Sequence, residues 1–587
     1  MTGMECFKKI KQGGFVTMKK RVLALLLSAC MVLGMAGCSS GKAETASDGG
    51  GGKASDAASE AAADASGPEG FNATGMPIMN EKITLKVWIE GGADIDWEQN
   101  RFVKEIEEKS NIKMEIISTP LSDALQKRNL MLASGDYPDL ILTDWPTVFT
   151  KSDVMQYGVK EGVLLPITDY IDKYGNNMKR IFDENPHYKE SCIAPDGEIY
   201  GFARFSECYH CSAYPKIYLR QDWMDALGLD MPETTEELRE VLRAFVNDDP
   251  NGNGKKDEIG MLGATTWNTM VEYALMGMSF QTVKPDFWLS LGADGKSVEF
   301  SPSTDAYREG LRYIKSLYDE GLIDGTSFTQ KEDQMAQTVR TEPHVVGMYV
   351  CDHAGMGYDN NDPVEAENYQ ILIPVAGPDG FRRQGQNANE GEIQGFHAVI
   401  TDACKYPEAA FRLIDEFFYD DDYNMERMHG ERGIGWDYVP EGTKNVFGGE
   451  ARYVVNSVSE DQSAEIKKDL MGVGPQADLA SFRLSMLPEA EDIYQPGNYE
   501  QRITLDTQKV EQYIPEERLD YMVYIPLDMA DDYAEIQTNL NNFVRMATVQ
   551  FITGDRDIES GWDQYLSELD SYRVDRYIEI YKAATGR

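Results

Sequence analysis

The hydrophobic pattern changes period several times along the chain after residue 80. Residues 83–89 alternate apolar and polar side chains, residues 97–110 repeat apolar positions at helical spacing, and residues 112–117 alternate again. A second helix is predicted over residues 122–133, and a short strand over residues 139–142. Strands that alternate with helices predict an α/β lobe with a largely parallel sheet.

Helical patterns dominate the rest of the chain, with short apolar strands between them. At 587 residues the chain is too long for one hydrophobic core, so we expect at least two lobes. The predicted helices cover residues 236–246, 305–320, 407–419 and 540–551, and the predicted strands cover residues 345–350, 369–374 and 397–401.

The amino-terminal segment has the pattern of an export signal. Basic residues follow Met18, an apolar run covers residues 22–33, and small residues precede Cys38. The apolar run is too short to span a bilayer, and the segment resembles a bacterial lipobox, in which the cysteine carries fatty acyl chains such as palmitate. We therefore expect residues 1–37 to be a signal peptide, with Met18 as the true start, and Cys38 to be the lipidated N-terminus.

A flexible linker is predicted over residues 38–78, because the segment is rich in Gly, Ala, Ser, Asp and Glu and poor in large apolar residues. The whole chain has a net charge of −43, and removing residues 1–37 takes away six basic residues and one acidic residue, which leaves −48. Such a surface repels nucleic acid and anionic lipid, so neither is an expected partner.

Five cysteines remain in the body of the chain, and an odd number cannot all form pairs. Cys208 and Cys211 have a spacing that suits a zinc site, a disulfide or two plain thiols, and the sequence leaves all three open. The others are Cys192, Cys351 and Cys404.

Several ordered motifs resemble the bacterial extracellular solute-binding proteins of family 1, the large lipoprotein-type binding proteins of sugar ABC importers. The resemblance runs from about residue 80 to the C-terminus. It is carried by LASGDYPDLI at 132–141, DGEIYGF at 196–202, LRQDWMDALGL at 219–229, GLRYI to GLI at 310–323, YPEAA at 406–410, and FITG with WDQYL at 551–566.

This resemblance implies an α/β fold of two lobes, the type II periplasmic-binding-protein-like fold, with a hinge between the lobes and the ligand cleft between them. The first lobe is expected at 79–207 and 394–450, and the second at 208–393 and 451–587. The implied protein is a monomer on the outer face of the cell membrane, held there by lipid alone. It captures an oligosaccharide or another small solute and delivers it to the permease subunits of an ABC transporter.

Residues 249–258, DPNGNGKKDE, place oxygen donors at alternating positions with glycines for tight turns, which suits a calcium ion. The segment is similar to the start of an EF-hand loop, although Gly260 stands where the twelfth position normally has Glu. Alginate-binding members of the family hold calcium in such a loop. The resemblance therefore implies a structural Ca²⁺ held by Asp249, Asn251, Asn253, Asp257, Glu258 and the carbonyl of Lys255.

Sugar recognition typically uses aromatic faces and planar polar groups. Trp88, Trp145, Trp267 and Trp436 stand at strand ends or in polar loops and are candidates for lining the cleft, whereas Trp223 and Trp562 have core spacing. The remaining ligand candidates are Asp144, Arg204, Tyr209, Arg382 and Glu390.

No motif in the chain requires catalysis. The sequence contains neither H-E-x-x-H nor G-x-S-x-G, and the loop at 292–297 lacks the glycine spacing of a phosphate loop and is interpreted as a hairpin turn. We expect a binding protein and no enzyme. The alternatives are a surface polysaccharide-degrading enzyme and a receptor that signals without transport, and arginines at 204, 382 and 383 leave acidic sugars open as ligands.

Overall fold

The computed structural model describes the body of the chain from residue 67 onward. The chain forms two units, residues 1–63 and 64–587, and the account below concerns the second. Cys38, the expected signal peptide, most of the linker, Trp267 and Glu390 lie outside the described residues. These are 67–92, 95–145, 147–266, 268–359, 362–385, 393, 395–445, 447–456, 458–487, 492–495 and 498–587.

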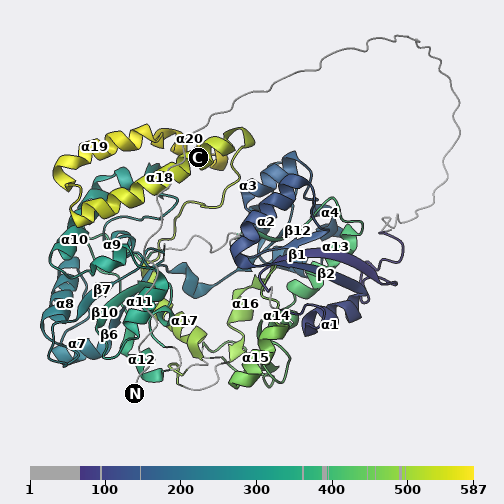
Figure 1. The fold of residues 1–587 in the computed structure, drawn as a ribbon, viewed down its shortest axis with the longest axis horizontal. Helices are drawn as coiled ribbons and strands as arrows, with labels where there is room; N and C mark the ends of the chain where they lie inside the picture. Colours follow the sequence, from purple (N-terminus) through teal and green to yellow (C-terminus); the bar gives the residue numbers. More distant parts are fainter. Residues whose placement is uncertain are drawn as a thin grey trace, which may run out of the picture. The chain divides into compact units, whose positions relative to one another are not determined.

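The first lobe is built on a five-stranded mixed sheet (Figure 1). Strands β1, β2 and β3 run parallel, and β12 runs antiparallel to both of its neighbours. The order in space is β2 (Ile112–Thr119), β1 (Ile83–Glu90), β3 (Leu140–Leu142), β12 (Phe396–Ile400) and β4 (Phe202–Ala203).

The helices of the first lobe begin and end at residues suited to those positions. Helix α1 (Arg101–Ser110) begins where the Asn100 side chain accepts a hydrogen bond from the Val103 amide, and it ends at Asn111, which is left-handed. The others are α2 (Leu121–Ser134), α3 (Lys151–Asp153) with a π-helix (Val154–Lys160), α4 (Thr168–Tyr174), α5 (Asn177–Glu184), α6 (Pro186–Cys192), α13 (Pro407–Phe418), α14 (Asp421–His429), α15 (Glu460–Asp469) and α16 (Ala480–Arg483).

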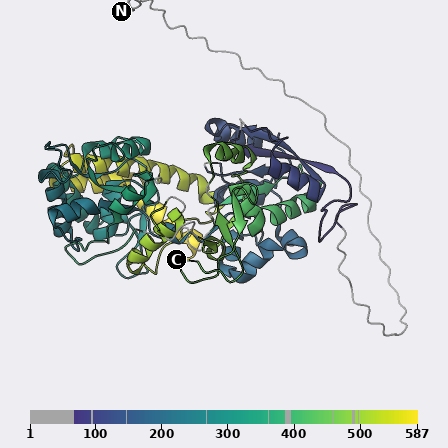
Figure 2. The same ribbon diagram turned by 90° about the horizontal axis from the view of Figure 1, so that it is seen from below.

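The second lobe has its own four-stranded sheet, and Figure 2 shows its teal elements as a group separate from the purple strands of the first lobe. The order is β11 (Tyr369–Ile371), β6 (Lys216–Arg220), β10 (Val346–Cys351) and β7 (Ile259–Leu262). Its helices include α7 (Gln221–Leu227), α8 (Thr235–Asn247), α9 (Val271–Ser279), α10 (Asp305–Asp319), α11 (Glu332–Val339), α12 (Pro363–Asn368) and α17 (Tyr499–Val510).

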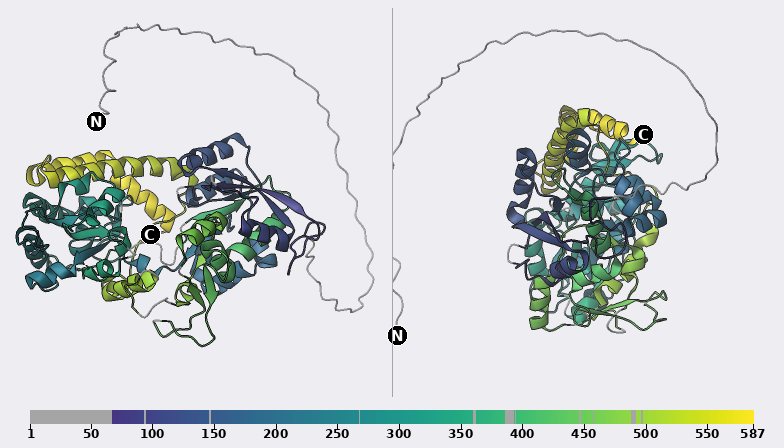
Figure 3. Two further views of the ribbon diagram at one scale, coloured as in Figure 1. Left: turned by 60° about the horizontal axis from the view of Figure 1, so that its bottom comes forward. Right: turned by 90° about the vertical axis from the view of Figure 1, so that its right-hand side faces the viewer.

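The C-terminal helices complete the core of the second lobe. They are α18 (Leu527–Thr553), α19 (Ile558–Ser571) and α20 (Val574–Thr585), and Figure 3 shows the long yellow α18 along the teal elements. One apolar cluster unites residues of α9, α10 and these helices. Trp223 and Trp562 are buried in it, as expected. The hairpin β8 (Leu289–Leu291) and β9 (Val298–Phe300) confirms the turn predicted at 292–297.

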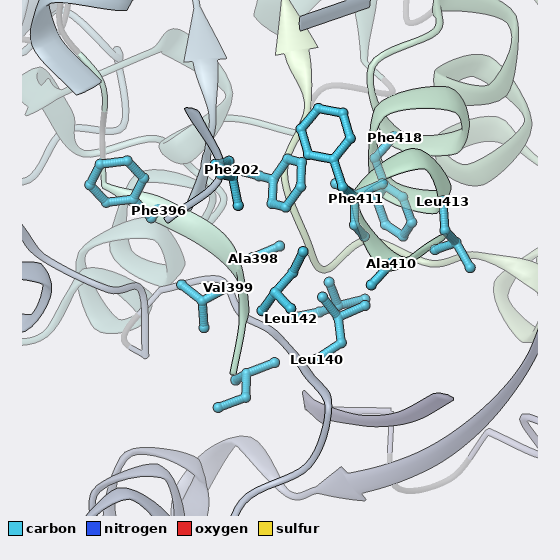
Figure 4. Packing of buried hydrophobic residues seen from close by; sticks show 14 of the residues in the cluster. Leu140, Leu142, Phe202, Phe396, Ala398, Val399, Ala410, Phe411, Leu413 and Phe418 are labelled. Atoms are coloured by element: carbon cyan, nitrogen blue, oxygen red, sulfur yellow. The ribbon is translucent and has the colours of Figure 1, made fainter. Parts of the chain in front are cut away.

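The core of the first lobe lies between its sheet and α13 (Figure 4). Phe411 and Phe418 of α13 pack in the same buried cluster as Leu140, Leu142 and Phe202 of the strands. All five side chains have no exposed area. The apolar spacing that predicted a helix over 407–419 therefore corresponds to the helix face that fills this core.

The chain returns to the second lobe later than expected. Strands β13 (Trp436–Tyr438), β14 (Tyr453–Val455) and β16 (Met486–Leu487) form one small sheet, and β15 (Ala477–Asp478) pairs with β5 (Phe205–Ser206). Met471, Ala477 and Leu479 also belong to the first-lobe core. Residues 451–487 therefore pack with the first lobe, and the expected boundary at 450 is wrong.

Candidate ligand cleft

The carboxyl edge of the first-lobe sheet gathers polar side chains. Glu90 ends β1, Asp144 and Trp145 follow β3, and Arg204 follows β4. His397 lies at the amino end of β12, which is the same edge because β12 runs antiparallel. Such edges line ligand crevices in open α/β sheets.

Glu90 fixes the loop that carries Asp144 and Trp145. It is 2 % exposed and accepts hydrogen bonds from the Asp144 amide at 2.7 Å and from the Thr147 hydroxyl. Burial raises the pKa of the Glu90 carboxyl. Trp145 stays 53 % exposed on this loop, whereas His397 is fully buried and burial lowers its pKa to about 4.

The carboxyl edge of the second-lobe sheet presents a second polar group. Asp352 and His353 follow β10, and the Asn268 amide, beyond β7, donates to an Asp352 carboxylate oxygen at 2.6 Å. His353 Nδ1 is hydrogen-bonded to the Tyr499 hydroxyl of α17. Burial lowers the pKa of His353.

The buried residue Lys216 is hydrogen-bonded to this edge. Its ammonium group donates to the carbonyls of His210 at 2.6 Å and Asp352 at 3.1 Å, and the residue is 1 % exposed. Burial lowers the pKa of Lys216 to about 8. Lys216 therefore joins two backbone segments. One contains His210 and leads from the first lobe into the second, and the other contains Asp352 and follows β10.

Three cavities are named the cleft cavities. Two of them include residues of these edges, and the third is lined by Glu207 and Tyr209, which lie between the two lobes in the sequence. The second-lobe cavity, about 840 Å³, is lined by Asn268, Glu332, Asp333, Arg340, Asp352 and His353 among others. The central cavity, about 390 Å³, is lined by Arg204, Asn424, Asp478, Phe482, Arg483, Met486, Tyr499, Glu500 and Gln501 among others. The outer cavity, about 990 Å³, is lined by Glu207, Tyr209, Glu511, Glu516 and Arg518 among others.

The central cavity combines residues of both lobes. Arg204 pairs with Asp478 at 3.1 Å within the first lobe. Arg483, at the end of α16, pairs with Glu500 of α17 at 2.5 Å and thereby joins the first lobe to the second. Phe482, Met486 and Leu487 supply an apolar wall. A wall of this kind beside planar polar groups suits a carbohydrate, which has both apolar ring faces and hydroxyls.

Cys208 and Cys211 form a disulfide in the segment that crosses from the first lobe to the second. His210 lies between them with its Nε2 3.1 Å from Cys208 Sγ, so the three residues have metal-binding proximity. The disulfide engages both sulfurs and leaves no thiolate for zinc. Cys192, Cys351 and Cys404 are buried free thiols.

The structure separates the predicted ligand residues. Arg204 and Tyr209 line the cleft cavities, and Asp144 and Trp145 stand at the carboxyl edge. Trp88 and Trp436 are 0 % and 1 % exposed, so the expectation that they line the cleft is wrong.

Each of the two buried indoles has a partner for its N–H group, so burial leaves no donor unpaired. Trp88 donates to the Thr119 hydroxyl at 2.9 Å, and Trp436 donates to the Gly430 carbonyl at 3.0 Å. Arg382 is also placed away from the cleft cavities. Its guanidinium donates to the Pro374 carbonyl and stacks 4.6 Å from the Tyr513 ring.

Residues that the sequence analysis missed make up most of the cleft lining. Asn268 and Asp352 follow strands whose carboxyl ends could have been used to find them. Asp478 and Arg483 lie in the short elements β15 and α16, and Glu500 lies in the first turn of α17; no local signal marks these three as cleft residues.

The predicted metal loop lies between α8 and β7. Asp249 accepts a hydrogen bond from the Gly254 amide at 3.0 Å, and Asn253 accepts one from the Lys255 amide at 2.8 Å. Asp249 Oδ1 and Glu258 Oε1 are buried and have no hydrogen-bond partner.

The remaining donors of the loop are held by side-chain hydrogen bonds. Asn253 Nδ2 donates to Asp257 at 3.0 Å, and Asn251 Nδ2 donates to the His344 carbonyl at 3.0 Å. Asn251 thereby keeps its side-chain oxygen on the inner side of the loop, where it accepts from the Asn253 amide at 3.0 Å. A set of carboxylate and amide oxygens with two orphaned acceptors fits a hard cation.

The fold and this cleft are those of a solute-binding protein. A model of the bacterial extracellular solute-binding protein family matches residues 96–424, so the chain belongs to this family. It is an extracellular binding protein rather than an enzyme. Among the described residues, none of the helices is both long and apolar enough to cross a bilayer.

Two relatives indicate the range of the family. The fructooligosaccharide ABC transporter substrate-binding protein FusA of Streptococcus pneumoniae is 29 % identical over 524 residues, 85 % of this chain and 86 % of FusA. The polygalacturonan/rhamnogalacturonan-binding protein YtcQ of Bacillus subtilis is 26 % identical over 349 residues, 57 % of this chain and 64 % of YtcQ.

Solved structures share the fold. A FusA EF-hand mutant in complex with fructo-nystose superposes with a TM-score of 0.67 at 26 % identity, covering 85 % of this chain and 98 % of that one. The alginate-binding protein AlgQ2 without calcium ion superposes with a TM-score of 0.62 at 19 % identity, covering 87 % of this chain and 99 % of that one.

Proposed function

We propose that this protein captures an oligosaccharide outside the cell and delivers it to the permease of an ABC transporter. The observation that carries this proposal is the central cavity, where an apolar wall and hydrogen-bonding side chains of both lobes face one space. FusA, a relative that aligns over 85 % of this chain, is itself the substrate-binding protein of a fructooligosaccharide ABC transporter.

Ligand capture follows from residues on both lobes. A sugar that contacts Asp478 in the first lobe and Tyr499 in the second binds the closed arrangement better than an open one, and so favours closure. The closed form then presents a surface that a permease can distinguish from the open form. Delivery by a monomer tethered to the membrane through acylated Cys38, with palmitate among its fatty acids, completes the proposal.

Lipid anchoring is testable on its own. Growth with labelled palmitate should label the wild-type protein, and Cys38→Ser should lose the label and appear in the culture medium. A labelled Cys38→Ser protein that stays with the membrane would contradict the anchor.

The loop at 249–258 is proposed to hold one structural calcium ion. Asp249, Asn251, Asn253, Asp257 and Glu258 supply side-chain oxygens, joined by the Lys255 carbonyl. The ion would satisfy the two orphaned oxygens, Asp249 Oδ1 and Glu258 Oε1, and would replace the hydrogen bond between Asn253 and Asp257. It would neutralise charge and add rigidity in the connection between α8 and β7. One solved FusA structure is of an EF-hand mutant, and one AlgQ2 structure is without calcium ion.

Calorimetric titration of chelator-treated protein tests the calcium site. We expect uptake of one ion and a rise in the thermal midpoint, both lost in Asp249→Ala. Asp294→Ala is the matched control, because Asp294 caps an exposed hairpin turn that the proposal does not use. Calcium uptake by Asp249→Ala equal to that of the wild type would refute the assignment.

The binding function is tested by thermal shift and calorimetry on residues 71–587 with calcium present. A sugar that raises the midpoint further at each increase in its concentration and is recovered intact supports a binding protein. New reducing ends would instead favour a polysaccharide-degrading enzyme. A Trp145→Ala variant should bind the same sugar more weakly with an unchanged midpoint of the free protein, because this indole is exposed beside the cleft.

A further inference from the structure

The arginines that left acidic sugars open as ligands are already engaged. Arg204 pairs with Asp478, and Arg483 pairs with Glu500, so both arginines that the structure places in the lining of the central cavity are compensated. Arg382 is held by the Pro374 carbonyl, and Arg383 lies over the Phe381 ring at 5.2 Å. Neither Arg382 nor Arg383 lines a cleft cavity.

The rest of the cleft lining is acidic. In the second-lobe cavity, Arg340 donates to the carbonyls of Gly355, Met356 and Gly357, while three carboxylates line the same space. Among the described residues, the lining of the three cleft cavities contains four guanidinium groups, those of Arg204, Arg340, Arg483 and Arg518. It contains eight carboxylates, those of Glu207, Glu332, Asp333, Asp352, Asp478, Glu500, Glu511 and Glu516.

Unpaired hydrogen-bond acceptors in the lining indicate a ligand that carries hydroxyl groups. Asn268 Oδ1 and Asp352 Oδ1 in the second-lobe cavity, and Asn424 Oδ1 and Gln501 Oε1 in the central cavity, are buried without a hydrogen-bond partner. Buried acceptors require donors. Sugar hydroxyls can donate to these oxygens and also accept from Arg204 Nε, which is unpaired in the same cavity. Neutral and uronate-containing sugars both carry hydroxyls, so the charges of the lining decide between the two.

We infer that the ligand is an uncharged oligosaccharide and that uronate-containing chains are rejected. This inference rests on the proposed function and names the chemical class of its substrate. Rejection comes from carboxylate groups of the lining that no arginine neutralises, because like charges in a partly desolvated cleft repel strongly. In the central cavity a cationic amino sugar gains no net attraction, because Asp478 and Glu500 are balanced by Arg204 and Arg483; the acidic surplus lies in the other two cavities.

A panel that varies only the ligand charge tests the inference. The mature protein with calcium is titrated with neutral fructo-, malto-, manno- and xylo-oligosaccharides. It is also titrated with oligogalacturonides, with the same oligogalacturonides after full methyl esterification, and with chitosan oligomers. We expect at least one neutral sugar to bind, and its Kd to change less than twofold between 20 and 500 mM NaCl, because no net charge is neutralised on binding. Free oligogalacturonides should bind at least tenfold more weakly than the best neutral sugar.

Variants of the lining test the physical cause. Glu332→Gln with Asp333→Asn removes two negative charges from the second-lobe cavity, so binding of an oligogalacturonide should improve severalfold at 20 mM NaCl and less at 500 mM. Glu535→Gln, an exposed change on α18 away from the cleft cavities, is the matched control and should change neither ligand.

The outcomes separate this inference from the proposed function. An oligogalacturonide or chitosan oligomer that binds most tightly overturns the charge inference and leaves a sugar-binding protein. Absence of binding by sugars of every charge removes the proposed function and this inference together. A neutral ligand whose Kd falls or rises tenfold with salt would also overturn the argument from charge.

Discussion

Glu272 should make the second lobe less stable as the pH rises toward neutrality. This carboxyl lies in the first turn of α9, is 6 % exposed, and its Oε2 has no hydrogen-bond partner. Burial raises the pKa of Glu272 from 4.5 to about 7. In the unfolded chain the group loses its proton near pH 4.5, whereas in the folded protein it keeps the proton until about pH 7. Stability contributed by the neutral form is therefore fully present below pH 4.5 and is lost progressively up to about pH 7.

The size of the effect follows from the difference in pKa. A pKa difference of one unit between the folded and unfolded states corresponds to about 1.4 kcal/mol of stability, so the shift of Glu272 corresponds to about 3 kcal/mol, lost between pH 4.5 and 7. Glu272→Gln keeps the shape and polarity of the protonated side chain but cannot ionise. At pH 8 the variant should be more stable than the wild type by about 2–3 kcal/mol, and at pH 4.5 the two should be equal.

Urea unfolding monitored at pH 4.5, 6, 7 and 8 measures this difference, and the transition of the second lobe is the one to follow because the two lobes need not unfold together. Glu535→Gln is the matched control, since it makes the same chemical change at an exposed glutamate of the same lobe. Parallel pH profiles for the wild type and Glu272→Gln would refute the reasoning.

Two further substitutions test buried side chains of the first lobe. Trp88→Ala should cost about 3–5 kcal/mol in thermal or urea unfolding, because it empties a fully buried site and leaves the Thr119 hydroxyl unpaired; a loss below 1 kcal/mol would contradict the burial. Arg427→Met should cost about 2–4 kcal/mol and expose the 471–476 segment to limited proteolysis, since the guanidinium donates to the Met471 carbonyl at 3.0 Å and to Gln476 at 2.6 Å. Unchanged protease resistance would show that the segment is held by other contacts.

Local periodicity predicted many of the elements, but not the full length or the burial of each. The strand at 83–89 and the helix at 236–246 were predicted within one residue at each end. The helix predicted over residues 540–551 begins earlier, at Leu527. The sequence missed its first half because that half has a polar pattern, and tertiary packing makes it helical all the same. Trp88 was misassigned for a related reason: a strand inside a largely parallel sheet is covered on both faces, so a residue near its end is buried although the local pattern suggests an edge.

The lobe boundary could not be predicted from the pattern, for a physical reason. Strand β15 is two residues long and pairs with β5, about 270 residues earlier in the chain. So short a strand carries no periodic signal, and its place is set by pairing and by the Arg427 hydrogen bonds. The same long-range contacts bring Asp478 beside Arg204, so the lining of the central cavity was hidden from sequence analysis together with the boundary.

The net charge of the chain is a poor guide to the ligand, and the cavity lining is a better one. At physiological salt the Debye length is about 8 Å, so most of the carboxylates behind the net charge of −43 are screened from a ligand in the cleft. Charges that line the cleft lie closer than this to a bound sugar and are partly shielded from salt. A strongly acidic protein could therefore still bind an acidic sugar if its cleft held free arginines. Here Arg204 and Arg483 are paired one to one with Asp478 and Glu500, and it is this local compensation that favours a neutral ligand.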